Sequence, residues 1–276
     1  MSYGFRARNI NGHVTIDENL IGYAYLGKHV LPSQVGNTYV DFTCVGVPLV
    51  YFDVPYNRTQ EEQGTATSLA RFRSRTGVCM VKLQDLGSNN WRAHFMIANY
   101  NGPDLGLYIR VFGKIHLNFA ASAGAHYGLR VRNSAGEVVF DYEAPMMALA
   151  GDTYGTEILL KPDVPMMDTD NADKYDTAVS VPFNMANKSI CATTRGVIHY
   201  PYDVAGSYDV GSGQFIDTYE VMAYYSMYWA NGSTLYARRV GGDSTQFQDV
   251  PGLIIDNSNC VPTYSRLAVI DNTRYP

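Results

Sequence analysis

An acidic run between residues 168 and 176 is the most conspicuous group of potential metal ligands. Four Asp residues lie between Asp168 and Asp176, and clustered carboxylates are the ligands that hard cations such as Ca²⁺ prefer. An EF-hand loop starting at Asp168 requires Gly at its sixth position and Glu at its twelfth, where this chain has Asp173 and Val179. An EF-hand is therefore excluded. A solvated acidic loop is favoured, and an irregular calcium site stays open.

Other catalytic signatures are missing from the sequence. No two histidines stand three or four residues apart, so no zinc or metalloprotease pattern forms. The glycines of Gly206–Gly213 are wrongly spaced for a nucleophile elbow, and the segment is typical of a flexible loop. These observations predict a non-enzyme with no cofactor, no catalytic residue and no metal ligand. A polysaccharide-cleaving enzyme stays open as an alternative, because its paired carboxylates can come from distant strands.

Composition narrows the class of partner. The net charge is −5, and no stripe of Lys and Arg with interleaved aromatics exists, so nucleic acid is not expected. Neither the first residues nor the apolar stretch 45–54, which contains Pro48, is long enough for a signal peptide or a membrane span. We therefore expect a protein without membrane insertion that is made in a cytosol. Four widely spaced cysteines lack a Cys-x-x-Cys pair and are interpreted as reduced, buried thiols: Cys44, Cys79, Cys191 and Cys260.

Tyrosine is unusually abundant, with 22 residues set among Gly, Asn and Ser. Its ring and polar tip suit contacts to sugars or proteins, although core roles are the more common use. Charged residues make up only 17% of the chain, and long helix-favouring stretches are missing. This composition predicts an all-β protein.

An internal repeat is the strongest signal in the sequence. Residues 3–17 return at 127–141 without a gap. The shared positions are Tyr3, Gly4, Arg6, Arg8, Asn9, Gly12 and Asp17 in the first copy, and Tyr127, Gly128, Arg130, Arg132, Asn133, Gly136 and Asp141 in the second. We infer duplication of one unit.

Each copy of the repeat predicts a β-hairpin. Alternating side chains flank Asn11-Gly12 in the first copy and Ala135-Gly136 in the second, where a glycine supplies the positive φ of a tight turn. The repeated Arg pair shares one face of its strand. We expect it to cover a sheet edge or to bridge to Asp17 and Asp141.

The rest of each half predicts further strands. They cover 39–44, 49–54, 77–83, 91–98 and 105–112 in the first half, and 157–160, 178–182, 189–194, 196–200, 218–229, 234–240 and 265–270 in the second. Small residues fill the stretch 118–125. We therefore predict two tandem, diverged β-sandwich-like domains, at 1–117 and 126–276, joined by a linker at 118–125.

A long hairpin at 218–240 is apolar on both faces. Two-sided burial of this strand predicts an interface with a second subunit, while a central strand covered by the chain's own loops is equally compatible. The candidate interface residues are Tyr219, Val221, Tyr224, Tyr225, Met227, Tyr228 and Trp229.

The opening Tyr-Gly-Phe-Arg, with Asn9, Gly12 and Asp17, resembles small tail-tip or tail-fibre proteins of tailed bacteriophages. The resemblance covers about the first thirty residues and their echo after Tyr127. It implies a non-enzymatic virion component that assembles in the host cytoplasm, often as a trimer, on other tail proteins such as a hub or central fibre. It also implies contact with a bacterial surface receptor or glycan.

The duplication suggests a division of labour within this resemblance. Docking is assigned to residues 1–117 and outward contacts to the second half, so a fragment starting near Ala125 is expected to fold and bind alone. The alternative function is a carbohydrate-binding or polysaccharide-cleaving β-rich module, which would act as a monomer.

Overall fold

The computed structural model describes residues 6–8, 14–17, 22–32, 36–57, 76–99, 105–119, 129–150, 156–160, 177–192, 197–209, 214–248 and 263–275. Antiparallel strands dominate it, which confirms the all-β prediction. The elements are β1 (Arg6–Arg8), β2 (Val14–Asp17), β3 (Tyr23–Val30), β4 (Gly36–Thr43), β5 (Leu49–Asp53), β6 (Thr76–Gly87), β7 (Asn90–Asn99), β8 (Tyr108–Lys114), α2 (Ile115–Asn118), β9 (Arg130–Arg132), β10 (Val138–Asp141), β11 (Thr156–Leu160), β12 (Thr177–Ser180), β13 (Lys188–Ala192), β14 (Val197–Asp209), β15 (Gln214–Asn231), β16 (Thr234–Gln248), β17 (Thr263–Asp271) and the 3₁₀ turn η3 (Asn272–Arg274).

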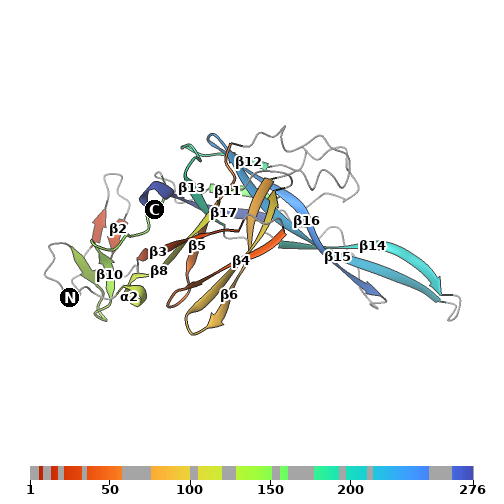
Figure 1. The fold of residues 1–276 in the computed structure, drawn as a ribbon, viewed down its shortest axis with the longest axis horizontal. Coiled ribbons are helices and arrows are strands. Elements are labelled where there is room, and N and C mark those ends of the chain that lie inside the picture. The colour runs from red at the N-terminus through yellow and green to blue at the C-terminus, as the bar shows by residue number, and fades with distance from the viewer. Residues whose placement is uncertain are drawn as a thin grey trace.

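Two large sheets make up the body (Figure 1). One is six-stranded, in the order β11-β17-β13-β5-β8-β3, and the other follows β12-β16-β15-β6-β7-β4, with β14 added on β15. Each sheet takes three strands from the chain before residue 118, and these meet their later counterparts in mirrored order. For example, β3, β8 and β5 correspond in position to β11, β17 and β13, counted from the two edges of the six-stranded sheet inward. A duplicated unit joined edge to edge would produce this order.

Both sheets continue across the middle of the chain. In the six-stranded sheet, β5 pairs with β13 through Asp53 and Ser189, and in the other sheet β6 pairs with β15 through Val78 and Tyr228. We call the β5 and β13 pairing, with the residues around it, the junction. The parts at 1–117 and 126–276 therefore share their sheets, and their division into two domains stays a prediction.

The main core lies between the two sheets. Strand alternation turns Val50 and Phe52 inward from β5, and the ring of Phe52 meets Phe95 of β7 at 5.7 Å and Tyr228 of β15 at 6.4 Å. The hydroxyl of Tyr228 donates a 3.1 Å hydrogen bond to Ser265 of β17. A single apolar core thus joins strands from both parts of the chain.

The outer face of the six-stranded sheet is covered as well. The segment 145–150 crosses it and binds its backbone: the amide of Met147 donates to the carbonyl of Tyr23, and that of Ala150 to Val269. Tyr275 lies over Phe112 at 5.0 Å, and its hydroxyl donates to Met146 and accepts from Ala148. This cover explains why β5 is buried on both faces.

The two copies of the repeat form hairpins with one register. Arg6 stands opposite Asp17 in β1 and β2, as Arg130 stands opposite Asp141 in β9 and β10. Arg130 Nε also donates to Asp141 Oδ2 at 2.7 Å, which is the expected bridge, and Gly136 has a φ of 79°. Both hairpins lie at the end of the molecule marked N in Figure 1. Six positions of the repeat lie outside the described residues: Tyr3, Gly4, Asn9 and Gly12 in the first copy, and Tyr127 and Gly128 in the second.

The second hairpin packs on the first part of the chain. Val138 of β10 shares a small core with Ala24 and Ile115, and the amide of Gly22 donates to the carbonyl of Val139. Within the predicted linker, Asn118 ends the short helix α2 and its side chain binds both backbone groups of Val45. Residues 120–125 lie outside the described chain.

Every strand expected from the sequence has a counterpart, although two features differ. The strand β3 was not expected, because Tyr23–Val30 mixes large and small residues without strict alternation. Residues 206–209 continue β14 instead of forming a flexible loop, since their backbone pairs with residues 214–217 of β15. No helix in the described residues has the length and apolar character needed to cross a membrane.

Candidate functional site

A β-ribbon leaves the body on the side opposite the hairpins (Figure 1). Strand β15 pairs with β6 at Tyr228, but from Tyr225 back to Gln214 its partner on that side is β14. We call this ribbon, residues 197–209, 214–225 and 240–248, the arm. At about 3.4 Å per residue, the β15 part of the arm is roughly 40 Å long. Among the described strands β14 pairs with β15 alone, so its other edge is open.

The predicted interface residues divide at the base of the arm. Met227, Tyr228 and Trp229 are at most 2% exposed and lie in the body, where Trp229 stacks on Tyr236 at 5.1 Å. These three side chains are therefore covered by their own chain. The remaining four have a described backbone in the arm and side chains outside the description: Tyr219, Val221, Tyr224 and Tyr225. The subunit interface stays a prediction, now restricted to the arm.

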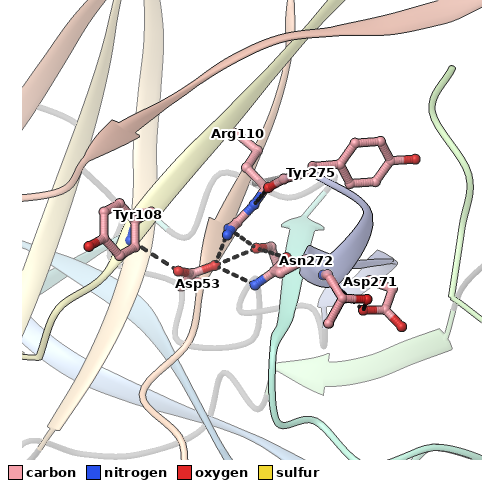
Figure 2. Close-up of polar contacts among 8 residues, drawn as sticks. Asp53, Tyr108, Arg110, Asp271, Asn272 and Tyr275 are labelled. Carbon is pink, nitrogen blue, oxygen red and sulfur yellow. Dashed lines mark hydrogen bonds and ion pairs between the residues drawn. The ribbon is translucent and has the colours of Figure 1, made fainter. Parts of the chain in front are cut away.

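A buried polar cluster sits at the junction, and Figure 2 shows Asp53 at its centre. Oδ1 of Asp53 accepts from Arg110 Nη1 at 2.6 Å, from the Ser189 hydroxyl at 2.5 Å and from Asn272 Nδ2 at 2.9 Å. Oδ2 accepts from the amide of Tyr108 at 3.1 Å. Asp53 and Arg110 come from β5 and β8, whereas Ser189 and Asn272 follow much later in the chain. We call these four side chains the junction cluster.

The turn η3 and Tyr275, which follows it, make further hydrogen bonds to the cluster and its neighbours. Arg110 Nε donates to the carbonyl of Tyr275 at 3.0 Å, and the amide of Asn272 donates to the carbonyl of Asn187. Beside them, Lys188 Nζ lies 3.2 Å from Asp271 Oδ2. Buried polar groups need such partners, because an unpaired one is costly in a low-dielectric interior. The cluster thus fastens η3 to both sides of the junction.

Nucleophilic catalysis does not fit this geometry. Ser189 is 0% exposed, and its hydroxyl also accepts from Arg110 Nη1 at 3.0 Å, so no substrate atom can reach it. A serine nucleophile needs an adjacent base and an open approach. The cluster instead holds strands from distant parts of the chain in register.

A cavity of about 390 Å³ opens beside the cluster. Its walls come from the ends of β5, β8 and β13 and from η3. The lining residues are Asp53, Val54, Pro55, Tyr56, Leu105, Gly106, Leu107, Tyr108, Arg110, Met185, Asn187, Lys188 and Asn272. Its volume lies within the range of about 300–1,000 Å³ that is usual for small-molecule sites.

Candidate metal and thiol chemistry finds little support in the described part of the chain. It contains no group of three or more His, Cys, Asp or Glu side chains placed to hold a metal ion. The acidic run Asp168–Asp176 and Cys260 lie outside it. Cys44, Cys79 and Cys191 are free thiols, and burial raises the pKa of Cys79 to about 12 and that of Cys191 to about 11.

Sequence reasoning missed the junction cluster, although a weak signal existed. Asp53 ends β5 between the apolar residues Phe52 and Val54, and Arg110 interrupts the apolar run of β8. A charged residue with apolar neighbours in or at the end of a strand indicates a buried, paired charge. Ser189 and Asn272 carry no comparable signal, because their role arises only when the sheets meet.

Comparisons with known proteins, by family model, by sequence and by fold, find no match to this chain.

Proposed function

We propose that this protein is a non-enzymatic structural component of a phage tail tip or fibre, which assembles through its arm and contributes to attachment at the host surface. The observation that supports this proposal most directly is the arm, whose strands β14 and β15 run far beyond the sheet that anchors them (Figure 1). The resemblance of the repeated motif to tail proteins supports it from the sequence.

The arm has the properties of an assembly element. A two-stranded ribbon is marginally stable alone in water, and a three-stranded one such as the arm needs a packed apolar face, so a long ribbon favours packing against something else. The open edge of β14 can also accept another strand through backbone hydrogen bonds. Its sequence, with Tyr219, Val221 and Tyr225 alternating along β15, supplies apolar groups for such packing. A second copy of the chain is the proposed first partner, with a trimer as the expected assembly.

The body suits a load-bearing role in the same proposal. Both sheets continue across the middle of the chain, and in one of them the junction cluster joins strands on the two sides of the junction. We keep the two predicted roles, docking by residues 1–117 and outward contacts by the second half. In this proposal they belong to the two ends of one body, the end with the hairpins and the end with the arm.

The test is the solution mass of the full-length protein, measured by light scattering coupled to size exclusion. A stable trimer or larger ring is expected. In a shortened variant, an Asn-Gly turn replaces residues 203–219 and joins Tyr202 to Glu220, which are register partners in the arm. This variant should be monomeric and folded.

The matched control changes a turn in the body. Ser88 and Asn89, which form the turn between β6 and β7, are replaced by Asn-Gly, and the oligomer should persist. A full-length protein that stays monomeric at high concentration, or a shortened variant that still forms the same oligomer, would contradict assembly through the arm.

A further inference from the structure

The cavity beside the junction cluster is polar and yet balanced in charge. Two cationic side chains line it, and each has a carboxylate partner: Arg110 lies 2.6 Å from Asp53, and Lys188 lies 3.2 Å from Asp271. Arg110 and Lys188 are both largely buried, with 6% and 13% of their side chains exposed. An anion entering the cavity would have to compete with these carboxylates, so the site favours a neutral ligand.

Two hydrogen-bonding positions in the cluster are still open. Nε and Nη1 of Arg110 bind protein groups, whereas Nη2 has no partner among the described residues. Asp53 Oδ2 accepts one hydrogen bond, from the amide of Tyr108, and a carboxylate oxygen can accept another. A donor and an acceptor are therefore available on two adjacent residues that line the cavity, Arg110 and Asp53.

A hydroxyl-rich ligand matches this arrangement. A hydroxyl group both donates and accepts, so neighbouring hydroxyls can bind Arg110 Nη2 and Asp53 Oδ2 together. The other walls combine the tyrosines Tyr56 and Tyr108 with apolar side chains such as Leu107. Such walls suit a ring that carries hydroxyls at its rim and C–H groups on its faces.

We propose that the junction cavity is a binding site for a neutral saccharide unit, with ring hydroxyls held by Arg110 Nη2 and Asp53 Oδ2. The proposal adds a ligand class and a site to the proposed attachment role, and it does not depend on assembly through the arm. A free sugar and the terminal unit of a surface glycan share this chemistry.

The test uses saturation-transfer NMR on the full-length protein. The probes are methyl glycosides of glucose, galactose, mannose, rhamnose and N-acetylglucosamine, with glucuronate and inorganic phosphate as charged comparisons. Maltotriose, lactose and chitotriose distinguish an extended glycan from a single sugar, because an extended ligand should bind more tightly than its monosaccharide. At least one neutral glycoside is expected to bind saturably, and the charged probes are not.

A matched pair of glycine variants locates the site. Gly106 lines the cavity with a φ of 56°, and a Cβ added there meets nothing within 4 Å. Gly136, in the β9–β10 turn, has a φ of 79° and equally open surroundings. Asn tolerates this backbone region, so both G106N and G136N should fold. G106N should reduce saccharide binding, because its side chain adds bulk at the cavity wall, while G136N should retain it.

A second variant tests the contact to Arg110. Arg110→Lys keeps a positive charge beside Asp53 but removes Nη2, and it should weaken saccharide binding about tenfold. Thermal unfolding confirms that each variant is folded before binding is measured. Failure of every neutral glycoside to bind, tighter binding of a charged probe, or equal binding by G106N and G136N would overturn the proposal. None of these outcomes would affect the oligomer test of the arm.

Discussion

Nη1 of Arg110 lies 2.6 Å from Oδ1 of Asp53, and both side chains are largely buried at the junction. A second Arg and Asp pair on the surface has almost the same geometry: Arg92 Nε lies 2.7 Å from Asp41 Oδ1, with 29% and 49% of the two side chains exposed. Equal distance does not mean equal energy, since water screens an exposed pair and leaves a buried one unscreened. The two pairs are therefore a natural comparison within one chain.

Arg110→Met should destabilise the fold strongly. It leaves Asp53 as a buried carboxylate without its cation, and breaking a buried pair in this way costs about 3–5 kcal/mol. Arg92→Met removes the exposed partner of Asp41 and should cost far less, because water already screens that pair. Urea unfolding of the three proteins, followed by circular dichroism, gives both values. Similar losses in the two variants would show that the junction cluster does not depend on this pair.

A fragment covering residues 126–276 should not fold alone. Its strands β13 and β15 would lose their partners β5 and β6, and Tyr228 would lose Phe52. An exposed edge and an uncovered apolar face both favour aggregation. This expectation replaces the one drawn from the repeat alone, that a fragment starting near Ala125 is self-sufficient. A sharp, dispersed NMR spectrum from the soluble fragment would contradict it, and co-expression with residues 1–125 should restore folding.

The three described thiols should be unreactive in the folded protein. Burial raises the pKa of Cys79 to about 12 and that of Cys191 to about 11, so at pH 8 almost none of either is the reactive thiolate. Burial also raises the pKa of Cys44, which makes its thiolate less abundant than in the unfolded chain. In a Cys260→Ser variant, which removes the cysteine outside the described residues, Ellman's reagent should react with no thiol until urea unfolds the chain. It should then count three. Rapid reaction of this variant without urea would show that a described thiol is accessible.

Stability should fall as the pH drops below about 6.5. Burial lowers the pKa of His29 below its usual 6.5, and burial together with the charges of Lys82 and Arg92 lowers that of His94. The unfolded chain therefore takes up protons at a pH where the folded chain does not, and acid favours unfolding. Asp41, whose pKa a hydrogen bond from Arg92 lowers below 3.8, loses its contribution only in stronger acid.

The measurement is the melting temperature between pH 7.5 and pH 5.5. The melting temperature of the original protein should fall as the pH is lowered over this range, and it should fall less in His29→Gln and in His94→Gln. A pH dependence that is the same in both variants and the original would mean that other groups are responsible.

The sequence predicted local structure well because local rules govern it. Alternation and turn residues located nearly all strands, and the glycine at position 136 marked a turn that has the expected positive φ. The strand β3 escaped notice because Leu26, Gly27 and Lys28 break its alternation. The all-β class follows directly from these local patterns.

The arrangement of the strands was beyond such rules. The apolar residues on both faces around Tyr228 and Trp229 predict that these side chains are buried, and they are. Whether another subunit or the same chain covers them depends on long-range pairing, which the pattern does not reveal. The pairing of Tyr228 with Val78 joins residues far apart in the chain, and nothing near either residue encodes it. The junction cluster and its cavity are hidden for the same reason.

The junction cluster also sets an order of events during folding. Asp53 binds Ser189 across a sequence separation of 136 residues and Asn272 across 219. Contacts this remote form slowly, because a long loop must close before they stabilise anything. During synthesis, Asn272 leaves the ribosome long after β5 and β8, so in that interval Asp53 has only its partners Arg110 and Tyr108 and the other edge of β5 is open. A chaperone that shields β5 in this interval would raise the yield of folded protein more than one acting after release.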